Sequence, residues 1–180
     1  MAAGYTWFKA AVFALLVGNT AILLTAGGTA SEALDAAAWL VLLASFELET
    51  GYGGRFRAGR MAAILRGARL VAAAAIVAAA IGYVGGKEWL DAINLALWIA
   101  VVALLEFEVR RPEAVAAHRA RFTAVATLLY CGLGVPVLVW AGRGEWFDAY
   151  DALLWLIAFA AIEIDLFKFA RQATTGSPSA

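Results

Sequence analysis

Six stretches of mostly apolar residues, separated by short polar segments, run along the 180-residue chain. A membrane hydrocarbon core of about 30 Å requires a helix of about 20 predominantly apolar residues to cross it. Since each stretch approaches that length, the pattern predicts one all-α domain over residues 1–180, a polytopic membrane protein with six transmembrane helices. The predicted spans are residues 7–26, 32–49, 66–85, 89–108, 121–141 and 147–168.

A motif of five positions recurs in the second, fourth and sixth apolar stretches. It consists of an acid, Asp or Asn three residues later, Trp four residues further, Glu eight residues after the Trp, and an acid two residues after that Glu. An apolar helix precedes each copy, so we expect three tandem parallel two-helix repeats over residues 6–50, 66–109 and 121–169, in a pseudo-threefold arrangement. The copies are Glu32, Asp35, Trp39, Glu47 and Glu49; Asp91, Asn94, Trp98, Glu106 and Glu108; and Asp148, Asp151, Trp155, Glu163 and Asp165.

The motif forms a polar stripe on each helix that carries it. With about 100° of rotation per residue, the first four motif positions fall within a sector about 120° wide. Charged side chains that face lipid near the middle of a bilayer are costly, so the stripe is expected to face the bundle interior. The helices 32–49, 89–108 and 147–168 are therefore predicted inside, with the other three packed around them.

The basic residues indicate the orientation in the membrane. Lys and Arg in short loops favour the cytoplasmic side, and 12 of the 14 basic residues fall on one side of the predicted topology. Both termini are therefore predicted to be cytoplasmic in a bacterial-type inner or plasma membrane, with residues 172–180 as a flexible tail. The zero formal net charge then divides into an acidic outer side and a basic inner side.

Residues 51–65 form a basic linker on the predicted cytoplasmic side. Here Arg55, Arg57 and Arg60 lie beside apolar Phe56 and Met61. This pattern is typical of a short amphipathic helix that lies on the headgroups, and a solvated basic loop is the alternative. Either form favours contact with anionic lipids of the bilayer.

Composition narrows the classes of function. The chain is 64% hydrophobic with a mean hydropathy of +0.80, against about 45–50% apolar residues in a soluble domain. These values exclude a soluble enzyme and a nucleic-acid binder. The single Cys131 and the single His118 form no disulfide, zinc or bis-histidine haem site. The sequence holds no recognised catalytic motif, so we expect no enzyme activity and no cofactor beyond a bound cation.

Polar groups at the predicted outer ends of the motif helices have two interpretations. They can form a negatively charged vestibule that concentrates cations. Alternatively, the acids cap the helices, because carboxylates are favoured at helix N-termini. The vestibule candidates are Glu32, Asp35, Asp91, Asn94, Asp148 and Asp151.

Acids near the predicted inner ends of the same helices form a second candidate site. Around a threefold axis, Glu47, Glu106 and Glu163 would form a ring of carboxylates suited to protons, Mg²⁺ or Ca²⁺. The alternative is that these acids pair with bases of the same helix, as the spacing allows for Glu106 and Arg110. The other acids of this candidate ion or proton site are Glu49, Glu108 and Asp165.

The motif tryptophans Trp39, Trp98 and Trp155 lie about two turns from the inner Glu. Three indoles directed to one axis would fill a small bundle, so we expect a packed aromatic layer and no open pore. We hypothesise a cation or proton channel or transporter that uses this acidic, Trp-bearing face. The alternative is a structural or accessory subunit, in a homo-oligomer or a larger membrane complex, whose acids position helices and contact partners.

Overall fold

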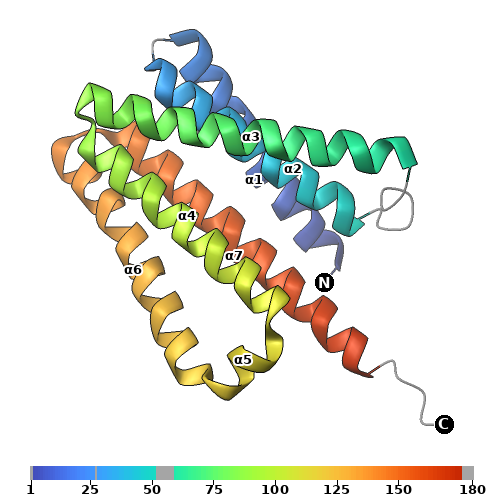
Figure 1. Cartoon of the computed structure of the whole chain (residues 1–180). Helices are drawn as coiled ribbons and strands as arrows, with labels where there is room; N and C mark the ends of the chain where they lie inside the picture. Colours follow the sequence, from blue (N-terminus) through green and yellow to red (C-terminus); the bar gives the residue numbers. More distant parts are fainter. Residues whose placement is uncertain (1, 27, 52–58, 176–180) are drawn as a thin grey trace. The chain divides into compact units, whose positions relative to one another are not determined.

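The computed structural model describes residues 2–26, 28–51 and 59–175, except for the side chains at 2–3, 49–51, 109 and 162–175. All regular secondary structure in these ranges is helical, which confirms the predicted all-α class (Figure 1). The helices are α1 (Ala2–Ala26), α2 (Ala30–Gly51), α3 (Gly59–Gly86), α4 (Trp89–Arg110), α5 (Pro112–Ala117), α6 (Arg119–Arg143) and α7 (Trp146–Thr175).

Within the described residues, four helices are long and apolar enough to cross a membrane. The helices α2 and α7 are not among these four, and α2 carries Glu32, Asp35 and Glu47 among its described side chains. The chain is thus consistent with a helical membrane protein, while six spans and a threefold repeat stay predictions. The four candidate spans are Gly4–Ala26, Gly59–Gly86, Trp89–Glu108 and Arg119–Arg143.

Two segments differ from the sequence-based expectation. Helix α3 begins at Gly59, so residues 59–65 of the predicted linker are its first turns and continue into the predicted third span. The part of the linker with Arg55 and Arg57 lies outside the described residues. The second difference is α5, a six-residue helix that was not predicted; its first residue is Pro112, whose fixed φ suits a first helical position.

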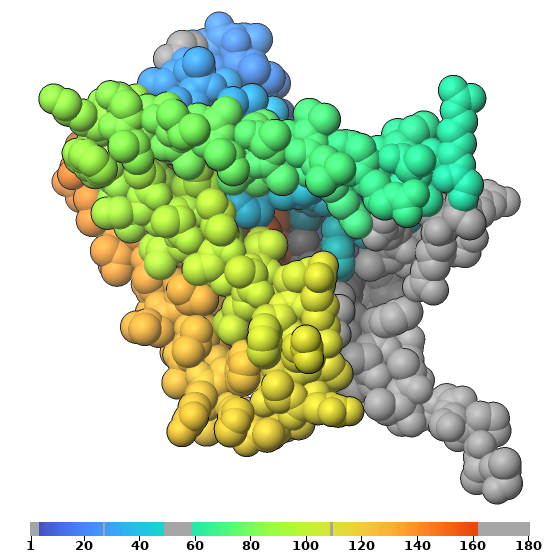
Figure 2. All heavy atoms as spheres, viewed as in Figure 1, coloured from blue at the N-terminus to red at the C-terminus, as the bar shows by residue number. Residues whose placement is uncertain are grey.

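The chain divides into two compact units, and the larger one comprises residues 17–133. Here α2 packs along α3, and α3 contacts α4 after a tight turn (Figure 1). Small side chains allow this packing, since Ala36 on α2 and Ala72 and Ala79 on α3 are buried. The outward side of α3 carries exposed Val77 and Ile81, as expected of a helix that faces lipid. Figure 2 shows the atoms of α3 uncovered on the side that faces the viewer.

The smaller unit comprises residues 1–16 and 134–180. Its first segment is attached to α7 by the Tyr5 hydroxyl, which donates a hydrogen bond to the backbone carbonyl of Ala161 at 2.7 Å. The ring of Trp155 packs against Phe159 with centroids 6.5 Å apart, and both side chains are buried. Helix α6 continues through the buried Pro136.

Candidate functional site

The turn before α4 and the turn before α7 have the same backbone geometry. Each preceding helix is followed by a residue with positive φ, which is Lys87 (62°) in one turn and Gly144 (80°) in the other. The hydrogen bonds are those of a Schellman motif, and they place Asp91 and Asp148 equivalently in the first turn of the next helix. Before α4, the Lys87 N–H donates to the carbonyl of Val84 and the Glu88 N–H donates to the carbonyl of Tyr83. Before α7, the Gly144 N–H donates to the carbonyl of Ala141 and the Glu145 N–H donates to the carbonyl of Trp140.

The start of α2 is held by a capping box. The Glu32 carboxylate accepts a hydrogen bond from the Thr29 N–H at 2.6 Å, and the Thr29 hydroxyl accepts one from the Glu32 N–H at 3.2 Å. This reciprocal pair satisfies two N–H groups that the first helical turn leaves without partners. Glu32 therefore acts as a helix cap, which is the structural alternative to a vestibule role.

We expect Thr29→Ala to lower the free energy of unfolding by about 1 kcal/mol, because the cap on the Glu32 N–H is lost. Thr25→Ala is the matched control, since the exposed Thr25 hydroxyl donates only to the carbonyl of Ala21 in the helix already formed. Detergent titration with SDS, followed by circular dichroism, measures both variants. Equal losses for the two substitutions would contradict the capping role.

A polar cluster lies where α2, α3 and α4 meet, inside the larger unit. The buried Tyr83 of α3 donates a hydrogen bond from its hydroxyl to Oδ2 of Asp35 on α2 at 3.4 Å. The carboxylates of Asp91 and Glu32 also lie close enough to act electrostatically on the Tyr83 hydroxyl. We call these four residues the Tyr83 cluster. One predicted vestibule acid, Asp35, thus contacts Tyr83, and two more, Asp91 and Glu32, lie within electrostatic range of it.

Two further polar side chains lie next to these residues on the chain. Asn94 follows Asp91 by three residues on α4, and Glu88 immediately precedes the helix. In the part of the chain that the structure describes, Oδ1 of Asn94 and Oε2 of Glu88 are buried and accept no hydrogen bond. A buried acceptor without a donor is costly, so a water, proton or cation at either oxygen would be stabilising.

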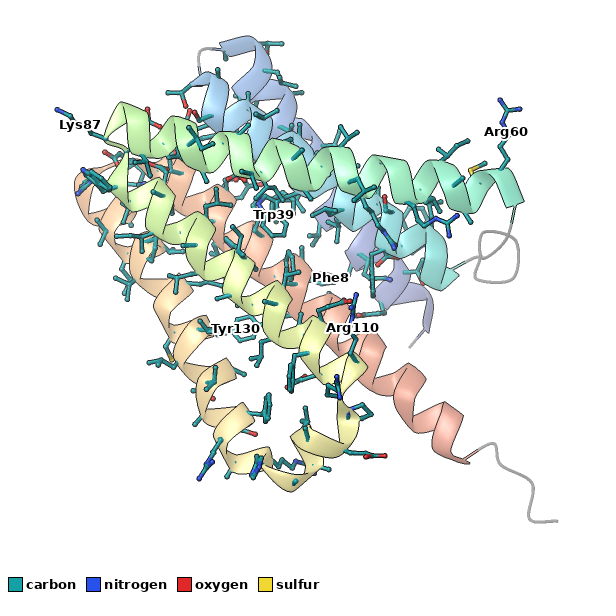
Figure 3. All side chains as sticks on the ribbon, in the orientation of Figure 1. Phe8, Trp39, Arg60, Lys87, Arg110 and Tyr130 are labelled. Atoms are coloured by element: carbon teal, nitrogen blue, oxygen red, sulfur yellow. The ribbon has the colours of Figure 1, made fainter. Side chains whose placement is uncertain are left out.

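Two of the three motif tryptophans contact each other. The rings of Trp39 on α2 and Trp98 on α4 are both buried, with centroids 6.3 Å apart and planes inclined at 54°. Trp39 lies in the interior of the larger unit, beside α3 (Figure 3). Trp155 belongs to the smaller unit, so a layer of three tryptophans stays a prediction, while the packed pair is a feature of the structure.

The predicted inner site is described only in part. Oε1 of Glu106 lies 2.5 Å from Nε of Arg110, and both side chains are more than half exposed. This ion pair is the alternative to the carboxylate ring, in which an acid pairs with a base of the same helix four residues later. Glu47 and Glu108 are half-buried, whereas the side chains of Glu49, Glu163 and Asp165 lie outside the described residues. The ring of Glu47, Glu106 and Glu163 therefore stays a prediction.

The remaining vestibule candidates, Asp148 and Asp151, are half-buried residues of α7 in the smaller unit. Across the described ranges, no three His, Cys, Asp or Glu side chains are grouped closely enough to hold a metal ion. The described acids of the Tyr83 cluster therefore do not form a ready coordination shell for a metal ion.

Comparison of the chain with protein-family models, with curated proteins and with solved structures found no match. The candidate site is therefore defined by its own geometry. Its central residue, Tyr83, was missed in the sequence, where it is the only aromatic residue in an Ala- and Gly-rich helix. One signal was present, because Tyr83 lies 57 residues before Trp140, the spacing that also separates Asp91 from Asp148.

Proposed function

We propose that this protein is an integral membrane protein that handles protons or small cations at the Tyr83 cluster. The observation that carries this proposal is the hydrogen bond of the buried Tyr83 to Asp35 between otherwise apolar helices, with the charges of Asp91 and Glu32 within electrostatic range. Polar and ionisable groups among membrane helices are costly and mark ion or proton pathways. Neighbouring carboxylates attract cations and protons because their negative potentials add.

The Trp39–Trp98 pair supports an occluded path over an open pore. Trp39 follows Asp35 by four residues and Trp98 follows Asn94 by four, so each indole lies one helical turn beyond a polar residue of the site. The buried indoles fill the space between α2 and α4 at that depth. A proton or cation that leaves the cluster must therefore wait for side chains to move, which is gated transport.

The proposed orientation follows from the basic residues and puts both chain ends in the cytoplasm. The Tyr83 cluster then lies toward the outer end of α3, and Arg60 lies at the opposite, cytoplasmic end. Figure 3 shows Lys87 and Arg60 at the two ends of α3, both pointing away from the helices. Arg60, with Arg55 and Arg57, is proposed to contact anionic lipids.

A liposome flux assay tests the proposed activity. We expect the wild type to pass protons or divalent cations faster than empty liposomes, read with pH-sensitive and cation-sensitive dyes inside the vesicles. Asp35→Asn keeps the side-chain shape but removes the charge, and should lower the flux at least about tenfold. Asp91→Asn should act in the same direction. The triple variant Glu47→Gln, Glu106→Gln and Glu163→Gln tests the predicted inner ring in the same assay.

Glu145→Gln is the matched control, since it removes an exposed acid from the equivalent turn before α7. It should leave the flux unchanged. Size-exclusion chromatography of each variant shows whether the fold is retained. No flux above empty liposomes, or equal flux in wild type, Asp35→Asn and Asp91→Asn, would contradict the proposal.

A structural or accessory subunit is the second candidate. The observations that favour it are the capping role of Glu32 and the in-helix pair of Glu106 with Arg110, because both give motif acids a purely structural use. This candidate predicts wild-type liposomes without flux and a stable association with further membrane subunits or with copies of this chain. The mass of the particle extracted in mild detergent distinguishes a homo-oligomer from a monomer.

A further inference from the structure

The connection between α4 and α6 gathers exposed positive charge over a short distance. Between residues 110 and 121 it holds four arginines and one histidine against a single acid, Glu113. All six of these side chains are exposed. One of the arginines, Arg110, is paired with Glu106 of the preceding turn, so the charge available to a partner comes mainly from the others. These are Arg111, Arg119 and Arg121.

Backbone hydrogen bonds hold this connection in one shape. The Arg111 N–H donates to the carbonyl of Phe107 at 2.8 Å, while the Arg111 carbonyl accepts from the Ala114 N–H at 3.1 Å. His118, the residue after α5, also bonds in both directions: its N–H donates to the carbonyl of Ala114 at 3.2 Å, and its carbonyl accepts from the Arg121 N–H at 2.9 Å. The connection is therefore two ordered corners joined by α5 (Figure 1).

An aromatic contact keeps the two corners close together. The rings of Phe107 at the end of α4 and Phe122 at the start of α6 are stacked, with centroids 5.4 Å apart and an interplanar angle of 17°. Two candidate membrane spans, Trp89–Glu108 and Arg119–Arg143, end at this connection. In a bilayer the stacked rings therefore lie near the edge of the hydrocarbon, and the arginines lie at the level of the headgroups.

We propose that this connection is a binding surface for anionic phospholipids, with Arg111 and Arg119 holding the headgroup phosphate from its two corners. A guanidinium group makes paired hydrogen bonds to phosphate oxygens, which suits this role better than a point charge. Phe107, whose side chain is 44% exposed, offers an apolar surface to the acyl chains beside the headgroup. The site is separate from the basic linker at Arg55, Arg57 and Arg60, and it does not depend on the proposed transport activity.

Native mass spectrometry of the full chain in detergent tests the proposal, with phosphatidylglycerol and phosphatidylcholine of identical acyl chains as competing probes. The wild type should retain phosphatidylglycerol in preference. The double variant Arg111→Gln, Arg119→Gln should reduce that preference at least about tenfold, as expected from the loss of two bases at an anionic surface. The matched control is the double variant Lys87→Gln, Arg143→Gln, which removes the same charge from exposed residues of the two tight turns. It should keep the preference for phosphatidylglycerol.

The single variant Arg119→Gln is included in case the double variant does not fold, and it should show a smaller loss in the same direction. A second arm adds inorganic phosphate to the wild type. We expect phosphate to leave the retained lipid in place, since it lacks the acyl chains that contact Phe107. An unchanged preference in the connection variants, an equal loss in the control, or displacement by phosphate would each overturn the proposal.

Discussion

Replacing Trp39 by alanine is expected to lower the free energy of unfolding by about 2–4 kcal/mol. In soluble proteins Trp→Ala in a core costs about 3–5 kcal/mol, as the sum of a transfer term and a cavity term. Between membrane helices the transfer term is reduced because lipid is itself apolar, so the cavity and the lost van der Waals contacts dominate. Trp39 is only 7% exposed and its partner Trp98 only 6%. We therefore expect the surrounding side chains to fill the cavity only in part.

Trp89→Ala is the matched control for this prediction. Trp89 lies on α4 like Trp98, but its side chain is 58% exposed, so its removal should change the stability by less than about 1 kcal/mol. SDS titration followed by far-ultraviolet circular dichroism avoids any dependence on tryptophan fluorescence. A double-mutant cycle of Trp39→Ala and Trp98→Ala should give a coupling of about 0.5–1.5 kcal/mol for the ring pair. A cost no larger than that of Trp89→Ala would show that the two rings do not stabilise the unit.

The sequence predicted interactions within one helix better than interactions between helices. The pairing of Glu106 with Arg110 follows directly from the four-residue spacing, because the helical repeat alone sets that geometry. The hydrogen bond from Tyr83 to Asp35 joins residues 48 positions apart on two helices. Nothing in the local pattern indicates which apolar helix supplies the hydroxyl, and the 57-residue spacing between Tyr83 and Trp140 does not show that Tyr83 contacts Asp35.

The sequence alone also does not separate buried positions from lipid-facing positions. Ile76 is 6% exposed and its neighbour Val77 is 58% exposed, yet both are branched apolar residues. In a soluble helix the exposed position would be polar and the burial pattern would be readable. Among membrane helices, lipid and the neighbouring helices both favour apolar side chains. The predicted inner and outer helices could therefore not be distinguished by hydrophobicity.

The motif still located residues that the fold brings together. Its spacing singled out Trp39 and Trp98, which form the ring pair, and Asp35 and Asp91, which share the Tyr83 cluster. Each pair comes from the first two copies of the motif, on α2 and α4. Two copies can meet in this way because the Schellman turn at Lys87 brings α4 back beside α3, which in turn packs against α2. Convergence of the third copy on the same axis stays a prediction.

The close approach of α2 and α3 beside the Tyr83 cluster depends on Gly82. A Cβ atom at this position would lie 2.1 Å from Oγ of Ser31 and 3.2 Å from its Cβ. We expect Gly82→Leu to destabilise the protein by about 1–3 kcal/mol through overpacking. Gly82→Ala should lower the stability less than Gly82→Leu, because the Ser31 hydroxyl can rotate away. Adding Ser31→Ala to Gly82→Ala should restore most of the stability that Gly82→Ala loses.

Gly85→Leu is the matched control, since Gly85 lies on the same helix and, its chain neighbours and the local helix backbone aside, no heavy atom lies within 4 Å of a Cβ built there. Both substitutions gain similar helix propensity, about 0.8 kcal/mol over glycine, so the difference between them isolates the contact with α2. SDS titration gives that difference directly. Gly82→Leu should also weaken flux in liposomes, because separating α2 from α3 pulls Asp35 away from the Tyr83 hydroxyl. Equal stability of Gly82→Leu and Gly85→Leu would show that α2 and α3 are not in close contact at Ser31, and the Tyr83 cluster would then lose its structural basis.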